Sequence, residues 1–132
     1  MDELCAVTDL LYGPGTPMPG LSLTDEEAMA LVRQRFPYAE FCLVRGWQWL
    51  ELEVSPAERD QLTKKGCQPV LVYAHTVVYD SARRWDVGDF VRSSPLHIWH
   101  GDGLFQTWNT LYVLLGEGQR KRVALETVGR IF

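Results

Sequence analysis

The sequence predicts an α+β domain in which two short helices pack on a strongly bent antiparallel sheet or partial β-barrel. Three observations support this fold class: two helix-capping motifs, a strand-like segment rich in Val and Tyr, and a series of turn residues after residue 69. The chain has 132 residues, of which 46% are hydrophobic and 23% charged. That length and composition are typical of a globular protein with one core, so we expect a single domain over residues 1–132.

The first part of the chain, residues 1–22, is expected to be an irregular arm. It contains a run of three Pro and three Gly that disfavours helical and ladder hydrogen bonds. Thr24 and Glu27 then form a capping box, in which each side chain can accept a hydrogen bond from the backbone amide of the other residue. This motif predicts a helix over residues 25–36, and Pro37 ends it.

Two strands are expected next, over residues 40–45 and 47–54. Gly46 lies between them and predicts a tight turn or a bulge. Side chains alternate along a strand, so Trp47 and Trp49 share a face with two glutamates. A face that carries charge beside two indole rings should be only partly covered.

A second capping box at Ser55–Glu58 predicts a short helix that stops at Gly66 and completes a helix-strand-strand-helix unit over residues 23–68. The remainder, residues 69–132, is expected to form an antiparallel β meander. Its turns contain Gly, Asp and Pro, and a central strand with apolar residues on both faces should be covered on both sides. The expected strands are 70–79, 90–93, 96–100, 104–115 and 120–128, with Gly101-Asp102-Gly103 as a hairpin connection.

Charge and cysteine content exclude several classes of protein. The formal net charge is −4 and the one basic cluster, residues 120–122, is short, which argues against binding nucleic acid through phosphate contacts. Cys5, Cys42 and Cys67 are odd in number and lack metal-ligand spacing, so neither a disulfide framework nor a structural zinc site is expected. The acidic N-terminus and the short apolar runs predict a cytoplasmic protein that does not contact a membrane.

The segment His97–Gly103 is the strongest candidate for catalysis, because it holds two of the three histidines, a tryptophan and a carboxylate. A small hydrolase or metal-dependent enzyme could use His97, His100 and Asp102, with His75 as a further candidate. Strand alternation, however, turns His97 and His100 to opposite faces, and Asp102 between two glycines suits a tight turn. We therefore expect no catalytic residue, metal or cofactor, and the enzyme is the alternative hypothesis.

The preferred hypothesis is a surface for binding another protein, because tryptophan and arginine are over-represented at binding hot spots. Five tryptophans are too many to be buried completely when some lie in loops and near turns. The competing interpretation is that these rings close the ends of a small barrel. The residues expected to contribute to the binding surface are Trp47, Trp49, Arg83, Arg84, Trp85 and Trp99.

Residues 88–94, Gly-Asp-Phe-Val-Arg-Ser-Ser, and residues 105–118 resemble a family of small uncharacterised bacterial proteins, a domain of unknown function. The resemblance covers the C-terminal half, and it implies no activity. Families of this kind often travel on mobile elements, which favours a role in conflict between phage, plasmid and host. We therefore expect a non-enzymatic protein-binding module, such as an inhibitor, immunity or anti-defence protein, and a homo-oligomer joined through strand edges is a further alternative.

Overall fold

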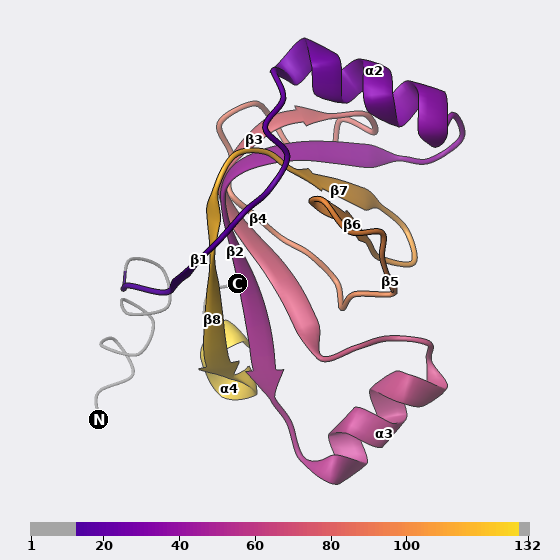
Figure 1. Ribbon diagram of the computed structural model, residues 1–132. Coiled ribbons are helices and arrows are strands. Elements are labelled where there is room, and N and C mark those ends of the chain that lie inside the picture. The colour runs from indigo at the N-terminus through magenta and orange to yellow at the C-terminus, as the bar shows by residue number, and fades with distance from the viewer. Residues whose placement is uncertain (1–12, 130–132) are drawn as a thin grey trace.

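The computed structural model describes residues 13–129, in which a single bent sheet carries helices at its two ends (Figure 1). The elements in chain order are β1 (Thr16–Met18), α2 (Asp25–Arg35), β2 (Phe41–Glu53), α3 (Pro56–Lys64), β3 (Val70–Asp80), β4 (Val91–Arg92), β5 (Ile98–Trp99), β6 (Leu104–Gln106), β7 (Leu111–Leu114), β8 (Gly118–Ala124) and α4 (Leu125–Gly129). The expected arm therefore contains a short strand, β1, which pairs with β8, and residues 1–12 lie outside the described residues.

Both capping boxes form, and the two predicted helices are confirmed. Thr24 Oγ1 accepts from the Glu27 amide at 3.1 Å, and Glu27 Oε1 accepts from the Thr24 amide at 3.0 Å. Ser55 and Glu58 make the same reciprocal pair at 3.1 and 2.9 Å. The helices differ in their packing, because α2 buries Ala28 and Val32 against the sheet whereas α3 has no buried residue.

The sheet is mixed, so the prediction of a purely antiparallel sheet and meander was wrong. β2 is its central strand: it pairs antiparallel with β3 on one edge and parallel with β7 and then β8 on the other (Figure 1). A bridge between Gln68 and Leu96 links the segment before β3 to the segment before β5, but the strands do not close into a barrel.

The parallel pairing arises because the chain does not reverse between β7 and β8. Leu43 pairs with Val113 and Leu50 pairs with Lys121, so the register shifts by one residue along the same edge of β2. Gly116, with φ +72°, lies at this shift and lets the chain continue in the same direction instead of forming the expected hairpin.

Three other predicted boundaries were wrong for local reasons. Gly46 does not separate two strands, because it sits inside the continuous strand β2 with φ +62°. The strand expected over residues 104–115 is a hairpin, because Thr107 Oγ1 accepts from the Thr110 amide at 3.0 Å and turns the chain between β6 and β7. The last strand ends at Ala124, where α4 begins.

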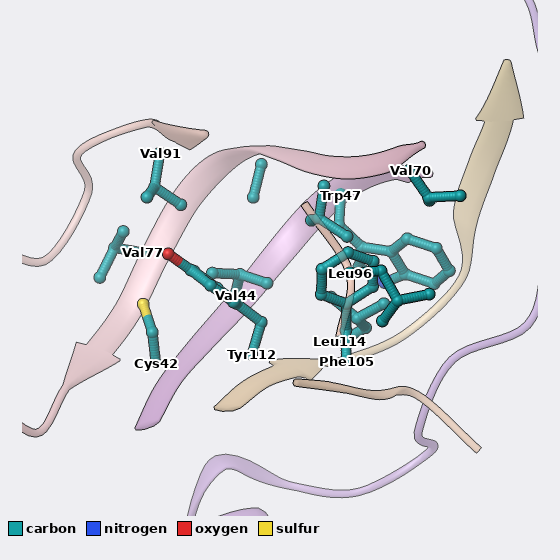
Figure 2. Close-up of a cluster of buried hydrophobic side chains, with 12 residues drawn as sticks. Cys42, Val44, Trp47, Val70, Val77, Val91, Leu96, Phe105, Tyr112 and Leu114 are labelled. Carbon is teal, nitrogen blue, oxygen red and sulfur yellow. The ribbon is translucent and has the colours of Figure 1, made fainter. Parts of the chain in front are cut away.

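Buried side chains form three clusters, one of which fills the inside of the bend (Figure 2). That inner cluster draws on β2, β3, β6 and β7 and includes Cys42, Trp47, Phe105 and Tyr112. The second cluster lies under α2, and the third lies beside α4 on the other half of the sheet. Within residues 13–129, no helix has the length and apolar character needed to cross a membrane.

Candidate functional site

Trp47 is not a surface residue, which corrects the prediction that it contributes to binding. Its side chain is 1% exposed, and its Nε1 donates to the carbonyl oxygens of Leu115 and Gly116, both at 3.2 Å. The positive φ of Gly46 resets the alternation of β2, so that Trp47 follows Cys42 and Val44 into the inner cluster (Figure 2). The face that Trp47 shares with Trp49 and the two glutamates is therefore covered at Trp47 but only partly covered further along, since Trp49 is half-buried and Glu53 is exposed.

Trp49 and Trp99 lie together at one end of a row of aromatic rings that lines the inner cluster. Their ring centroids are 5.0 Å apart in an edge-to-face arrangement, and Trp49 contacts Phe105 in the same way at 5.6 Å. Phe105 contacts Tyr112, and Tyr112 contacts Trp85, each at 6.4 Å. Trp49, Trp85 and Trp99 are half-buried, so the row is core packing with solvent access at its ends.

The second end of this row is held by an ion pair between the buried Asp80 and the partly exposed Arg84. The Asp80 side chain has no exposed surface, and Arg84 Nη2 and Nε donate to its two carboxylate oxygens at 2.8 and 3.1 Å. The Arg84 amide donates to the same carboxylate at 2.6 Å, and Arg84 Nη1 donates to Thr110 Oγ1 at 2.6 Å. These bonds fix the start of the loop between β3 and β4 to the sheet.

Electrostatics at this anchor keep Asp80 charged and its buried neighbours neutral. Burial alone would raise the pKa of the Asp80 carboxyl, but hydrogen bonds from Arg84 and the backbone amides of Arg84 and Trp85 hold it below its ordinary value. Burial and the nearby Asp80 charge raise the pKa of the Cys42 thiol to about 12, and burial also raises the pKa of Tyr112. Neither neighbour is suited to act as a nucleophile near neutral pH.

The anchored loop exposes a small apolar surface, which we call the Trp85 surface and define by Trp85, Val87, Phe90 and Arg92. Val87 is 76% exposed and Phe90 is 52% exposed. Trp85, Phe90 and Arg92 line a shallow hollow of about 420 Å³ together with Asp89 and Val91. The Arg84 guanidinium lies over the Trp85 ring, 4.6 Å from its centroid, and fixes the orientation of that ring.

Arg83 and Arg84 have different roles, although the sequence presents them as neighbours of the same kind. Arg83 is exposed with φ +54° at the beginning of the loop, whereas Arg84 is committed to the buried pair with Asp80. Of the six predicted binding residues, the structure places Arg83, Arg84 and Trp85 together at this loop, and it does not bring Trp47, Trp49 or Trp99 to the same surface.

The histidines proposed for the alternative enzyme contact different parts of the fold. His97 Nδ1 lies 2.6 Å from the Gly66 carbonyl oxygen, while His100 Nε2 lies 2.5 Å from Gln106 Oε1 and its ring contacts Phe36. The predicted divergence of the two rings is confirmed. His75 Nδ1 lies 3.3 Å from the Tyr73 hydroxyl.

Asp102 lies in a turn, as predicted. It is exposed with φ +52° between Gly101 and Gly103, which also have positive φ. Across residues 13–129, no three His, Cys, Asp or Glu side chains form a group that could hold a metal ion.

The exposed apolar residues that the sequence reasoning missed include Val87, Phe90 and Trp108. An available signal for Val87 is its position in the polar turn Asp86-Val-Gly-Asp89. Phe90 was hidden by the expected strand over residues 90–93, whereas β4 begins at Val91. Trp108 falls at the tip of the β6–β7 hairpin, which the sequence pattern hides inside an apparent long strand.

Comparison with known proteins identifies a family without supplying an activity. No curated protein and no solved structure gives a significant match to the chain. A family model described as a domain of unknown function matches residues 19–130, well beyond the C-terminal half in which the resemblance was first visible. The chain therefore belongs to the family of this domain of unknown function, DUF6957.

Proposed function

We propose that this protein is a non-enzymatic protein-binding module and that a partner protein docks on the Trp85 surface. The observation that carries the proposal is the exposure of Val87 and Phe90 on a loop whose base is fixed by the Asp80–Arg84 pair. Binding residues are commonly presented on loops held by a rigid scaffold, and exposed apolar side chains that gather together mark interaction sites.

The Asp80–Arg84 pair favours binding because it already orders the loop, so a partner has less of the loop left to order when it binds. The Trp85 ring is held between the Arg84 guanidinium and Tyr112, and Phe90 contacts Tyr73 at a centroid distance of 6.2 Å. Side chains that are already ordered lose less conformational entropy on association. A partner side chain seated in the hollow would meet Trp85 and Phe90 as anchors of the type found at hot spots.

We further propose that the partner is a protein whose activity the module blocks, as an inhibitor, immunity or anti-defence protein does. This role follows the expectation that families of small uncharacterised bacterial proteins often travel on mobile elements. The buried, neutral Cys42 and Tyr112 and the separated histidines favour binding over catalysis.

Affinity capture with matched surface variants tests the proposal. Tagged protein is incubated with an extract of the native host, and the captured proteins are compared with those retained by a Val87→Ser/Phe90→Ser variant. The control is Tyr38→Ser, which changes an exposed aromatic residue outside the Trp85 surface. We expect a partner that the wild type and the control retain and that the double variant loses.

Two outcomes would overturn the proposal. One is a partner that the double variant retains as strongly as the wild type does. The other is that no protein is retained and that light scattering also shows a monomer. The light-scattering measurement is needed because a second copy of the chain could itself be the partner.

A further inference from the structure

Trp108 is exposed and yet held rigidly at the tip of the β6–β7 hairpin. Its Nε1 donates to the Lys65 carbonyl oxygen at 2.8 Å, immediately after α3. The His97 ring stacks on the indole with a centroid distance of 3.8 Å and an interplanar angle of 18°. Although these contacts fix its position, Trp108 is 61% exposed.

The same two rings attach the end of α3 to the sheet. His97 Nδ1 is 2.6 Å from the Gly66 carbonyl oxygen, so two successive backbone carbonyls at the end of the helix receive ring nitrogens. Gly66 has φ +72°, and a Cβ there would lie 3.2 Å from the Trp108 ring. Since α3 has no buried residue, its end is defined by these ring contacts rather than by a hydrophobic face.

The segments that contact Trp108 contain basic but no acidic residues, although the whole chain has a net charge of −4. The segments that meet there, residues 61–68, 95–99 and 106–110, contain Lys64, Lys65 and His97 but neither Asp nor Glu. Lys64 is paired with Asp60 of the preceding turn at 3.1 Å. Lys65, whose backbone carbonyl receives the indole N–H, therefore carries the basic side chain of these segments that is not paired with Asp60, and it lines a hollow that also contains Glu58.

We propose that Lys65, His97 and Trp108 form a second binding surface, the Trp108 surface, which takes an acidic segment of a partner protein. An apolar side chain of that segment lies on the exposed part of the indole, and a carboxylate meets the Lys65 ammonium group. The fixed indole reduces the entropy lost on binding, and the Lys65 ammonium group supplies charge complementarity to the carboxylate. Nucleic acid is a poorer fit, because two lysines and one imidazole are few for a site that must neutralise several phosphates.

The proposal is independent of the Trp85 surface, because the two surfaces are built from different elements. A random-peptide phage library selected on the wild-type protein tests it, with the enriched peptides synthesised and their affinities measured by calorimetry. We expect the enriched peptides to be rich in Asp and Glu with a neighbouring apolar residue. Binding should fall about tenfold or more in Trp108→Ala, and several-fold in Lys65→Glu.

Trp108→Ala removes contacts that hold the end of α3, so a loss of binding in that variant could reflect a change of structure. Lys65→Glu avoids this problem, because Lys65 contacts the indole through its backbone carbonyl and the substitution leaves that hydrogen bond in place. Phe90→Ser is the control, and peptides of the Trp108 surface should bind it as they bind the wild type. The proposal is overturned if no enriched peptide requires Trp108 for binding. It is also overturned if the peptides that require Trp108 lack acidic residues, or if they bind Lys65→Glu as strongly as the wild type. Displacement of these peptides by a thymidine oligonucleotide would overturn it as well. Peptides lost only in Phe90→Ser would support the Trp85 surface and count against this one.

Discussion

Replacing Arg84 by Met should destabilise the fold substantially, because it leaves the Asp80 carboxylate buried without its guanidinium partner. Removing one partner of a buried ion pair costs about 3–5 kcal/mol. Two features of this pair reduce that figure: the Arg84 side chain is 31% exposed, and the Arg84 amide still donates to the carboxylate at 2.6 Å. We expect the free energy of unfolding at neutral pH to fall by about 2–3 kcal/mol.

The loss of stability should depend on pH in a direction set by the pKa of Asp80. The folded protein holds the pKa of this carboxyl below its ordinary value of 3.8, so the pair stabilises the fold above that value and loses its effect as the pH falls through the folded pKa. Arg84→Met raises the pKa of Asp80 in the folded state. The difference in unfolding free energy between wild type and variant should therefore be full at neutral pH and shrink below about pH 4.

Urea unfolding followed by circular dichroism, repeated from neutral pH to about pH 3, measures this difference. Arg83→Met is the matched control, because it removes the same charge from the adjacent exposed residue and should change the unfolding free energy by less than about 0.5 kcal/mol. A loss below about 1 kcal/mol for Arg84→Met, or a loss that keeps its size at about pH 3, would refute the role given to the pair.

Two further predictions concern the inner cluster. Gly118→Ala should cost about 2 kcal/mol or more in thermal or urea unfolding, since its Cβ would lie 2.3 Å from the Trp47 ring. The cost should shrink in a Trp47→Leu background, and a cost that is the same in both backgrounds would contradict this. Cys42 is fully buried and has a pKa of about 12, so it should resist alkylation in the folded protein while the half-buried Cys67 reacts. Peptide mapping by mass spectrometry measures the two alkylation rates. Equal rates at the two thiols would mean that Cys42 is accessible.

The elements that local sequence predicts are those whose hydrogen bonds are local. Thr24 with Glu27, and Ser55 with Glu58, satisfy amides within one helical turn, so the capping motif alone identifies α2 and α3. The parallel pairing of β2 with β7 and β8 depends on residues far apart in the chain. Turn residues at Gly116 and Gly118 suggest a reversal there, and only the shared edge of β2 shows that the chain continues.

The candidate site was predicted in part for the same reason. Trp85 and its neighbouring arginines stand in a loop, where exposure can be read from composition, and the structure places them there. The burial of Trp47 could not be predicted from strand alternation, because exposure changes along a single face of β2, from the buried Trp47 to the exposed Glu53. The contact of Trp108 with the end of α3 joins residues 43 positions apart and leaves no local pattern.

The position of β2 also governs the order in which the chain can fold as it is synthesised. Glu51 pairs with Val70 soon after both are made, but Leu43 must wait for Val113, 70 positions later. At about 5–20 residues per second, a ribosome needs roughly 4–14 s to add that stretch. During this interval one edge of β2 has no strand beside it, and a nascent chain stalled before residue 111 would present that edge to other chains. Sheet completion is therefore a late, long-range event, of the kind that slows folding relative to helices and hairpins.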